Sequence, residues 1–368
     1  MSAPIKVCHF TSVHPEKDIR IFYKECIALA NAGFEVYLVS TGTLNNKEQG
    51  VNFISVKKDT SSRFSRLFKT RKEVYKAALN VNADIYHFHD SELLPYGVKL
   101  KRKGKVVVYD AHEDLPRQIL SKHYIPVYLR KFVSYLVEKI ENYYSSKLSG
   151  IIGATPVIES RFKKINPNTI SICNYPSLSE FNQPIDWEHK KEEICYIGGI
   201  FNVRGGTEMI NLLPLINARL NLAGIYSPES YKEELKKLSG WDKVNDYGFV
   251  NRDEIKKILD RSILGLMLLH PLRSYIDSLP IKLFEYMAAG IPVIASDFPL
   301  WKAIINEGPC GFCVDPFDLD KIAEEINKLL VNKDYAEQLG KNGRRLIEEK
   351  YNWEVEQQKL INFYKNQN

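Results

Sequence analysis

Short apolar segments alternate with longer stretches of helical apolar spacing along most of the chain. Strands that alternate with helices form a parallel sheet covered by helices on both faces, so the pattern predicts an α/β fold. In the first half, the expected strands are residues 5–10, 35–40, 51–56, 84–89, 105–110, 151–155 and 169–173. The expected helices of this half lie at about 20–32, 64–80 and 91–103.

A polar segment, residues 175–192, interrupts the alternation, and a second series of strands and helices follows it. Its prolines and clustered charges are typical of an interdomain linker. We therefore expect two Rossmann-like, doubly wound parallel-sheet domains, 1–174 and 193–351, and a final helix at about 352–368. Such domains bind ligands at the carboxyl ends of their strands, so two of them are expected to face a central cleft.

Residues 275–296, YIDSLPIKLFEYMAAGIPVIAS, combine a helix start, two charges on one helix face and a strand. Pro280 fits the first helical position, and Lys282 and Glu285 share a face. Gly290 is suited to end the helix in a left-handed turn, and the apolar run after it predicts a buried strand. A helix N-terminus attracts phosphate, and a carboxylate further in binds hydroxyls. The segment therefore indicates a nucleotide-sugar site.

Composition and charge exclude several classes of protein. A chain of 368 residues is long enough for two domains, and 44% hydrophobic with 26% charged residues is typical of soluble globular proteins. The net charge of +6 favours anionic ligands but is far from that of a dedicated nucleic-acid binder. No apolar run approaches the ~18–20 residues of a membrane span, and the first residues lack a signal-peptide core. The expected location is the cytoplasm.

The run SLPIKLFEYMAAGIPVIAS resembles the family 4 retaining glycosyltransferases, which belong to glycosyltransferase group 1 and have the GT-B fold of two facing Rossmann-like domains. The resemblance covers nearly the whole chain. The family usually has two glutamates with seven residues between them, and this chain has Asp277 and Glu285 at those positions. Aspartate keeps the charge but shortens the reach by one methylene.

This resemblance implies the activity. A retaining, metal-independent hexosyltransferase would move a sugar from a UDP- or GDP-linked donor to a glycan or lipid-linked saccharide acceptor. The expected setting is the biosynthesis of a bacterial surface polysaccharide, lipopolysaccharide or capsule. No cofactor is expected besides the donor substrate, and no nucleic acid is expected as a partner.

The resemblance also assigns residues in the second domain. Glu285 would bind the ribose, while Arg204 in YIGGIFNVRGG and Lys282 would bind the diphosphate. The family often has an earlier basic residue near Gly199, which this chain lacks, so Lys282 supplies the second charge instead. The full donor-side set is Gly199, Arg204, Asp277, Ser278, Leu279, Lys282 and Glu285.

In the first domain, His112 in YDAHEDLP matches the histidine that lies over the donor sugar and the reaction centre. The catalytic assignments are thus His112, Arg204, Asp277 and Lys282. The loop TSVHPEKDIR resembles the one that faces acceptor and diphosphate. The expected acceptor-side residues are His14, Asp18, Arg20 and His89. The final helix resembles one that packs back on the first domain.

Each assignment has a simpler alternative. Arg204 would be an ordinary solvated residue at a helix start. Lys282 would form a salt bridge with Asp277 or Glu285. Asp277 would cap the helix that follows it.

A metal site is a further alternative in the first domain. His87 and His89 lie two apart on one strand face, a spacing that metal ligands use, and His9, His14 or His112 would complete the set. Asp318-Leu319-Asp320 resembles the D-x-D of metal-dependent transferases, but helix capping explains it better. We expect no metal.

Two segments of the first half, 63–76 and 117–144, mix basic and aromatic residues. Segments of this kind dock proteins on anionic membranes, and an enzyme with a lipid-linked acceptor requires such docking. The expected membrane surface is the inner face of the cytoplasmic membrane. Solvated helix faces over an ordinary core are the alternative.

Three rival functions stay open at this point. A nucleotide-sugar epimerase has the same two-domain architecture but no glycan acceptor. A catalytically inactive binding or scaffold protein would have a decayed site, and a metallohydrolase would depend on His87 and His89.

Overall fold

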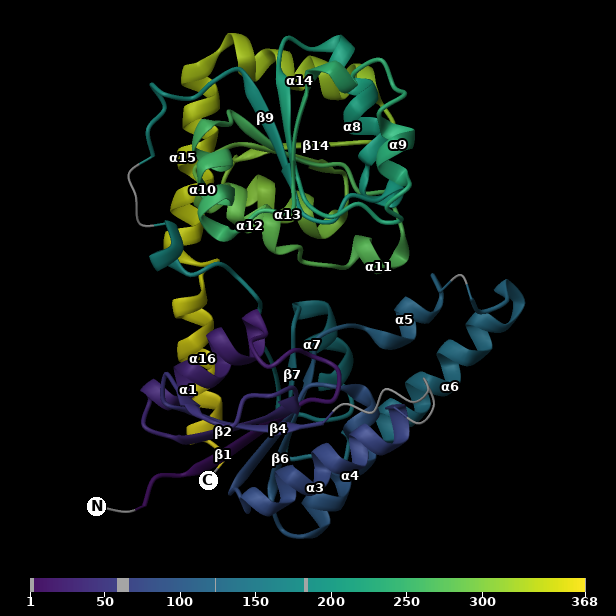
Figure 1. Ribbon diagram of the computed structural model, residues 1–368, viewed down its shortest axis with the longest axis vertical. Coiled ribbons are helices and arrows are strands. Elements are labelled where there is room, and N and C mark those ends of the chain that lie inside the picture. Colours follow the sequence, from purple (N-terminus) through teal and green to yellow (C-terminus); the bar gives the residue numbers. More distant parts are fainter. Residues whose placement is uncertain (1–2, 58–65, 123, 182–184, 368) are drawn as a thin grey trace. The chain divides into compact units, whose positions relative to one another are not determined.

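The computed structural model describes residues 3–57, 66–122, 124–181 and 185–367 and divides into two compact units (Figure 1). The N-terminal unit comprises Met1–Asn174 together with Trp353–Asn368, and the C-terminal unit comprises Tyr175–Asn352. The segment predicted as a linker is thus part of the C-terminal unit, and its described residues include a short 3-10 turn, η4 (Leu178–Phe181).

The sheet of the N-terminal unit has the order β3-β4-β2-β1-β5-β6-β7-β8. Its neighbours pair in parallel except β3 with β4. The order reverses between β1 and β5, which is the topological switch point of a doubly wound sheet. The strands are β1 (Lys6–Phe10), β2 (Glu35–Thr41), β3 (Lys47–Glu48), β4 (Val51–Val56), β5 (Ile85–Phe88), β6 (Val106–Ala111), β7 (Gly150–Gly153) and β8 (Thr169–Ser171).

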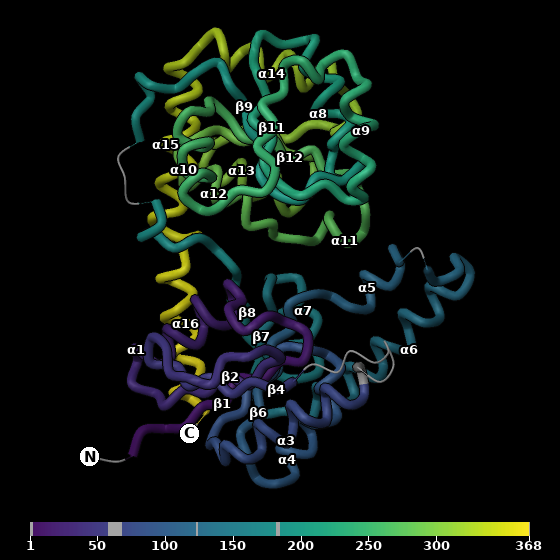
Figure 2. Tube along the Cα trace, viewed as in Figure 1, coloured from purple at the N-terminus to yellow at the C-terminus, as the bar shows by residue number. Residues whose placement is uncertain are grey.

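Helices cover both faces of this sheet. One face packs against η1, α1 and α16, and the other against α3, α4 and α7, because each helix places an apolar stripe on the sheet. Figure 2 shows α16 alongside α1 in this unit. The helical elements are η1 (Ile19–Cys26), α1 (Ile27–Asn31), η2 (Arg66–Thr70), α3 (Arg71–Val81), η3 (Ser91–Leu93), α4 (Leu94–Arg102), α5 (Leu115–Ile119), α6 (Val127–Ser145), α7 (Pro156–Lys163) and α16 (Trp353–Lys365).

The sheet of the C-terminal unit has the order β11-β10-β9-β12-β13-β14, with parallel neighbours throughout. This is the strand order of the dinucleotide-binding fold, and it reverses between β9 and β12. The strands are β9 (Glu193–Ile197), β10 (Arg219–Ala223), β11 (Val244–Gly248), β12 (Leu264–Met267), β13 (Val293–Ser296) and β14 (Gly311–Val314). The prediction of two Rossmann-like parallel-sheet units is confirmed.

The helices of this unit pack on both faces of its sheet, around an apolar core that includes Tyr196, Ile210, Leu266 and Ile326. The helical elements are η5 (Asn202–Arg204), α8 (Gly206–Leu212), η6 (Leu213–Leu215), α9 (Tyr231–Leu235), η7 (Trp241–Lys243), α10 (Arg252–Arg261), α11 (Arg273–Ile276), α12 (Ile281–Ala288), α13 (Pro299–Glu307), α14 (Leu319–Val331) and α15 (Lys333–Glu349). Within the described ranges, no helix is both long and apolar enough to cross a bilayer.

The segment around α12 differs from its prediction by one residue at its start. Pro280 is the N-cap, with an extended ψ of 129°, so the helix begins at Ile281. Its end is as predicted: Gly290 has a φ of +64°, which glycine adopts without strain, and the chain turns into buried β13.

Candidate functional site

Two glycines at the carboxyl end of β9 lie where the strand order of the C-terminal unit reverses. A Cβ atom on Gly198, whose φ is +131°, would lie 2.8 Å from Lys282 Nζ. A Cβ atom on Gly199 would lie 3.2 Å from Arg204 Nη1. The glycine pair thus lets two cationic side chains approach the backbone at the position where doubly wound sheets bind ligands.

Lys282 is the less expected of the two cations. Its Nζ is buried, lies 3.8 Å from the centroid of the Tyr196 ring, and donates no hydrogen bond to a described residue. Burial, and then the neighbouring Arg204, lower the pKa of Lys282 to about 7, although Glu285 raises it in part. The alternative of a salt bridge from Lys282 to Asp277 or Glu285 is therefore wrong. This arrangement suits the binding of an anionic ligand.

Arg204 ends the turn η5, directly before the start of α8. Its guanidinium carbon lies 4.8 Å from the ring centroid of Phe201 and 6.0 Å from that of Tyr275, and its buried Nε has no hydrogen-bond partner in the described chain. The next residue, Gly205, has a φ of +77°, and a Cβ there would lie 2.2 Å from the carbonyl oxygen of Leu268. Only glycine lets the backbone at position 205 lie this close to the Leu268 carbonyl. This contact fixes the loop, and the loop in turn fixes the position of the neighbouring Arg204.

Glu285 lies on α12 and is 8% exposed. Its Oε1 accepts a hydrogen bond from Arg252 Nη1 at 2.5 Å, and Arg252 also bonds Glu180. Sequence reasoning missed Arg252, because it lies 33 positions away and meets Glu285 only through packing. An ionised carboxylate accepts up to about four hydrogen bonds, so Arg252 leaves capacity for a ribose diol.

The loop between α11 and α12 contains the remaining donor-side candidates. Asp277 follows α11, while Pro280 is the N-cap of α12 without a side-chain hydrogen bond, so the alternative that Asp277 caps α12 is wrong. Ser278 Oγ donates to the carbonyl of Tyr275 at 2.8 Å, and the Ser278 carbonyl accepts from Trp301 Nε1 at 2.7 Å. These bonds fix the loop, in which the side chains of Asp277 and Leu279 are partly exposed.

In the N-terminal unit, His112 follows the last residue of β6, as predicted. Its Nε2 lies 3.0 Å from Asp110 Oδ2 and 3.1 Å from His89 Nδ1. Asp110 is buried and also receives both Nε and Nη2 of Arg20, at 2.9 and 2.8 Å. Burial alone would raise the pKa of Asp110, but Arg20 and His112 hold it well below its usual range. The ionised Asp110 therefore orients His112.

Arg20, which was expected on the acceptor side, is buried in the N-terminal unit. Arg20 is 4% exposed, and besides Asp110 it donates Nη1 to the carbonyl of Ile172 at 2.7 Å. Its guanidinium is thus bonded within the N-terminal unit, where it positions Asp110. His89 is likewise buried, beneath His112.

His14 and Asp18, the other two acceptor-side candidates, lie in the partly exposed loop between β1 and η1. His14 Nδ1 lies 3.4 Å from Asp18 Oδ2, and its Nε2 lies 3.6 Å from Asp90 Oδ1. Burial lowers the pKa of His14, but Asp18 and Asp90 more than offset this and raise it above its ordinary value. An open hollow of about 470 Å³ is lined by His14, its neighbours Val13 and Pro15, residues 41–43 and Lys57.

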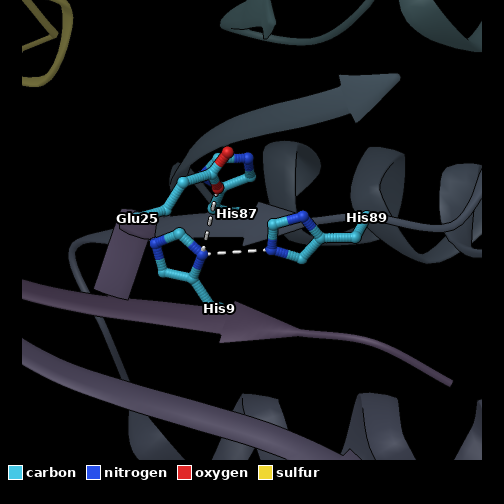
Figure 3. Close-up of side chains that lie close together, drawn as sticks. All are labelled: His9, Glu25, His87 and His89. Carbon is cyan, nitrogen blue, oxygen red and sulfur yellow. Dashed lines mark hydrogen bonds and ion pairs between the residues drawn. The ribbon is translucent and has the colours of Figure 1, made fainter. Parts of the chain in front are cut away.

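The two alternatives weighed for metal binding have different outcomes. Asp318 is the N-cap of α14 and accepts the N–H of Lys321 at 3.0 Å, so helix capping accounts for it. His87 and His89, in contrast, lie close to His9 and to Glu25, a residue that sequence reasoning missed (Figure 3).

Comparison with known families accounts for most of the chain. The "Glycosyltransferase Family 4" model matches residues 20–173, and the "Glycosyl transferases group 1" model matches residues 179–346. The protein is a member of the family 4, group 1 glycosyltransferases. The two models correspond to the two units of the structure.

Curated relatives of this family member match only in part. It is 28% identical over 210 residues to the "Uncharacterized glycosyltransferase MJ1607" of Methanocaldococcus jannaschii, covering 55% of this chain and 53% of that protein. It is 25% identical over 256 residues to the "Capsular polysaccharide biosynthesis glycosyltransferase CapM" of Staphylococcus aureus, covering 63% and 65%. The matches thus span between about half and two thirds of these relatives.

Solved structures show that this glycosyltransferase family member has the GT-B fold. Sucrose-phosphate synthase from Thermosynechococcus elongatus superposes with a TM-score of 0.78 at 17% identity, over 98% of both chains. HepE from Anabaena in complex with UDP superposes with a TM-score of 0.74 at 13% identity, over 99% of this chain and all of the other. The fold-class prediction is confirmed.

Proposed function

We propose that this protein transfers a sugar from a UDP- or GDP-linked donor to a hydroxyl of a glycan or lipid-linked saccharide acceptor, with retention of configuration. The observation that carries the proposal is the buried Nζ of Lys282, which lies beside Arg204 at the β9 edge and has no hydrogen-bond partner within the described part of the chain. Family membership and the complex of HepE with UDP support a nucleotide-sugar donor.

The two cations would stabilise the diphosphate as it leaves. Arg204 presents a planar guanidinium that suits bidentate phosphate binding. Lys282 acts as a point charge, because a bound anion raises the pKa of its amine and the amine then takes up a proton from solvent. The N-terminal N–H groups of α12 add a favourable dipole. Charge that develops on the leaving group is therefore neutralised without a metal at the diphosphate, which is how the site would lower the barrier.

The remaining donor-side residues hold the substrate. Glu285 accepts hydrogen bonds from the ribose, and the anchored loop of Asp277, Ser278 and Leu279 contacts the sugar. On the family resemblance, we assign His112 to the donor sugar and His14 to the acceptor side. The acceptor oxygen bonds to the anomeric carbon as the bond to the diphosphate breaks. The hydroxyl proton passes to the departing phosphate oxygen, and attack on that same face gives retention.

We also propose that α6 docks the protein on the anionic inner face of the cytoplasmic membrane, where a lipid-linked acceptor resides. Tyr128, Phe132 and Tyr135 are 82%, 60% and 56% exposed, and their spacing places them on one helix face with the exposed Lys131 and Lys139. Apolar rings interleaved with lysines suit a bilayer interface with anionic headgroups. Residues 63–65 of the other basic segment lie outside the described residues.

A turnover assay tests the proposed activity. The protein is incubated with UDP- and GDP-linked sugars in EDTA, with and without saccharide acceptors, and the anomeric protons of the products are followed by NMR. We expect acceptor-dependent transfer with the donor's anomeric configuration. Interconversion of the sugars without an acceptor would identify an epimerase instead. Loss of activity in EDTA that Mg²⁺ or Mn²⁺ restores would contradict metal independence.

A further inference from the structure

A buried cluster of three histidines and one glutamate lies at the carboxyl edge of the N-terminal sheet. His9 comes from β1, His87 from β5, His89 from the position after β5, and Glu25 from η1. Each offers one ligand atom, and these four atoms lie within 4.8 Å of one another. Figure 3 shows the four side chains close together, with dashed lines from His9 to Glu25 and from His9 to His89.

The outward-facing nitrogens of these rings are already held. His87 Nδ1 lies 2.5 Å from the Tyr364 hydroxyl, and that hydroxyl lies 3.2 Å from His9 Nε2. His89 Nδ1 lies 3.3 Å from Asp110 Oδ2. Histidines that ligate metals commonly have their second nitrogen bonded to a carboxylate or another polar group, which fixes the ring. All three rings are held in this way.

The inward-facing atoms, in contrast, are poorly satisfied. His87 Nε2 and both Glu25 oxygens are buried without a hydrogen-bond partner among the described residues, although Arg20 Nε lies 3.1 Å from Glu25 Oε1. His9 Nδ1 lies 3.1 Å from His89 Nε2 and 4.0 Å from Glu25 Oε2. Buried polar atoms without partners are costly, and a shared cation would satisfy all four ligands at once.

From this arrangement we infer that His9, Glu25, His87 and His89 bind a divalent transition metal ion, with zinc as the best-fitting choice. Three imidazoles and a carboxylate are ligands that zinc accepts, and a tetrahedral site separates ligand atoms by about 3.4 Å. Ligand shifts of roughly an ångström would close the present spacing to that geometry. The site would be closed and structural, and it would tie β1, β5 and η1 together beneath His112.

The geometry favours this set over a neighbouring one. His89, Asp110 and His112 also lie close enough to share an ion. Both oxygens of Asp110, however, already accept hydrogen bonds from Arg20, whereas neither oxygen of Glu25 has a hydrogen-bond partner among the described residues. His14, which the sequence suggested as a ligand, faces Asp18 and Asp90 instead. The inferred site differs from the expectation of no metal and leaves the diphosphate chemistry of the C-terminal unit unchanged.

Cobalt substitution tests the inference without any activity assay. The untagged chain of 368 residues is treated with a chelator, checked for folding by circular dichroism, and titrated with Co²⁺ and then Zn²⁺. We expect one Co²⁺ per chain with the intense visible absorption of a tetrahedral site, displaced by one Zn²⁺. Zinc should also raise the melting temperature.

Two variants locate the ion. Glu25→Gln and His87→Gln should each weaken binding at least tenfold, whereas His189→Gln, which alters a histidine whose side chain is 83% exposed, should not. Folded wild-type protein that binds no stoichiometric Co²⁺ or Zn²⁺ would overturn the inference, whatever the variants do. Binding that both ligand variants retain unchanged would overturn it as well.

Discussion

Lys282 Nζ lies 3.8 Å from the centre of the Tyr196 ring, in a position where it has no hydrogen-bond partner in the described chain. A face-on aromatic ring attracts an ammonium group, but it neutralises no charge. Burial, and then the nearby Arg204, lower the pKa of the amine to about 7. In the free protein Lys282 is therefore positioned to bind an anion, which would favour the protonated, positively charged form of its amine.

Donor affinity should depend on pH through Lys282. A bound diphosphate raises the pKa of the amine, so above pH about 7 binding must also take up a proton. The affinity for UDP-glucose should thus be flat below this pH and fall by up to about tenfold per pH unit above it. Calorimetry between pH 6 and 9 measures this, since the donor's diphosphate does not titrate there.

Lys282→Met supplies the control for this profile. The variant should bind more weakly at low pH and lose the slope above pH 7. Lys302→Met, which removes an exposed lysine paired with Asp297, should keep the slope. A slope that persists in Lys282→Met would assign the titration to another group.

Removal of the Glu285 carboxylate should weaken donor binding. Hydrogen bonds to a charged group contribute about 1.5–3 kcal/mol, so Glu285→Ala should raise the dissociation constant of the nucleotide sugar about 10- to 100-fold. Glu254→Ala, which removes a partly exposed α10 carboxylate paired with Lys257, is the matched control. Near-normal affinity and turnover in folded Glu285→Ala would show that this carboxylate serves only its ion pair with Arg252.

Alanine substitutions at two glycines with left-handed backbones distinguish the cost of backbone strain from the cost of a steric clash. Gly248 has a φ of +60° with nothing within 4 Å of a built Cβ, so Gly248→Ala should cost about 1 kcal/mol through strain alone. Gly205 has a similar φ, but its Cβ would meet the Leu268 carbonyl. Gly205→Ala should therefore lower the melting temperature further and displace Arg204, with loss of donor affinity. Equal effects on affinity in the two variants would contradict this account of the loop.

Sequence reasoning located the local features well. The strand at 51–56 is observed with those bounds, and Gly290 ends α12 in the left-handed turn that was expected. These features depend on neighbouring residues and on backbone preferences that a short segment carries with it. The Rossmann-like fold follows from the same alternation.

The contacts between distant positions could not be predicted. The bond of Arg20 to Asp110 spans 90 positions, and that of Arg252 to Glu285 spans 33. Arg20 lay in a loop that resembled a substrate-facing one, yet tertiary packing buries it. Residues 182–184 of the predicted linker lie outside the described residues.

If α6 docks the protein on a membrane, removal of its exposed aromatic rings should weaken vesicle binding. The double variant Tyr128→Ser and Phe132→Ser removes two exposed rings, so binding to vesicles with anionic lipid should fall about tenfold or more in sedimentation. Phe249→Ser, at an 80% exposed position of the C-terminal unit, is the control. Equal binding of the wild type to neutral and anionic vesicles at low salt would rule out electrostatic docking.

The central claim is that the cationic site of Arg204 and Lys282 binds the diphosphate of a nucleotide donor without a metal. Calorimetric titration of UDP, GDP and ADP in EDTA measures this directly. The account predicts one nucleotide per chain for at least one of them, with markedly weaker binding to Lys282→Met. Absence of binding to any nucleoside diphosphate at millimolar concentration would contradict the claim and favour an inactive scaffold.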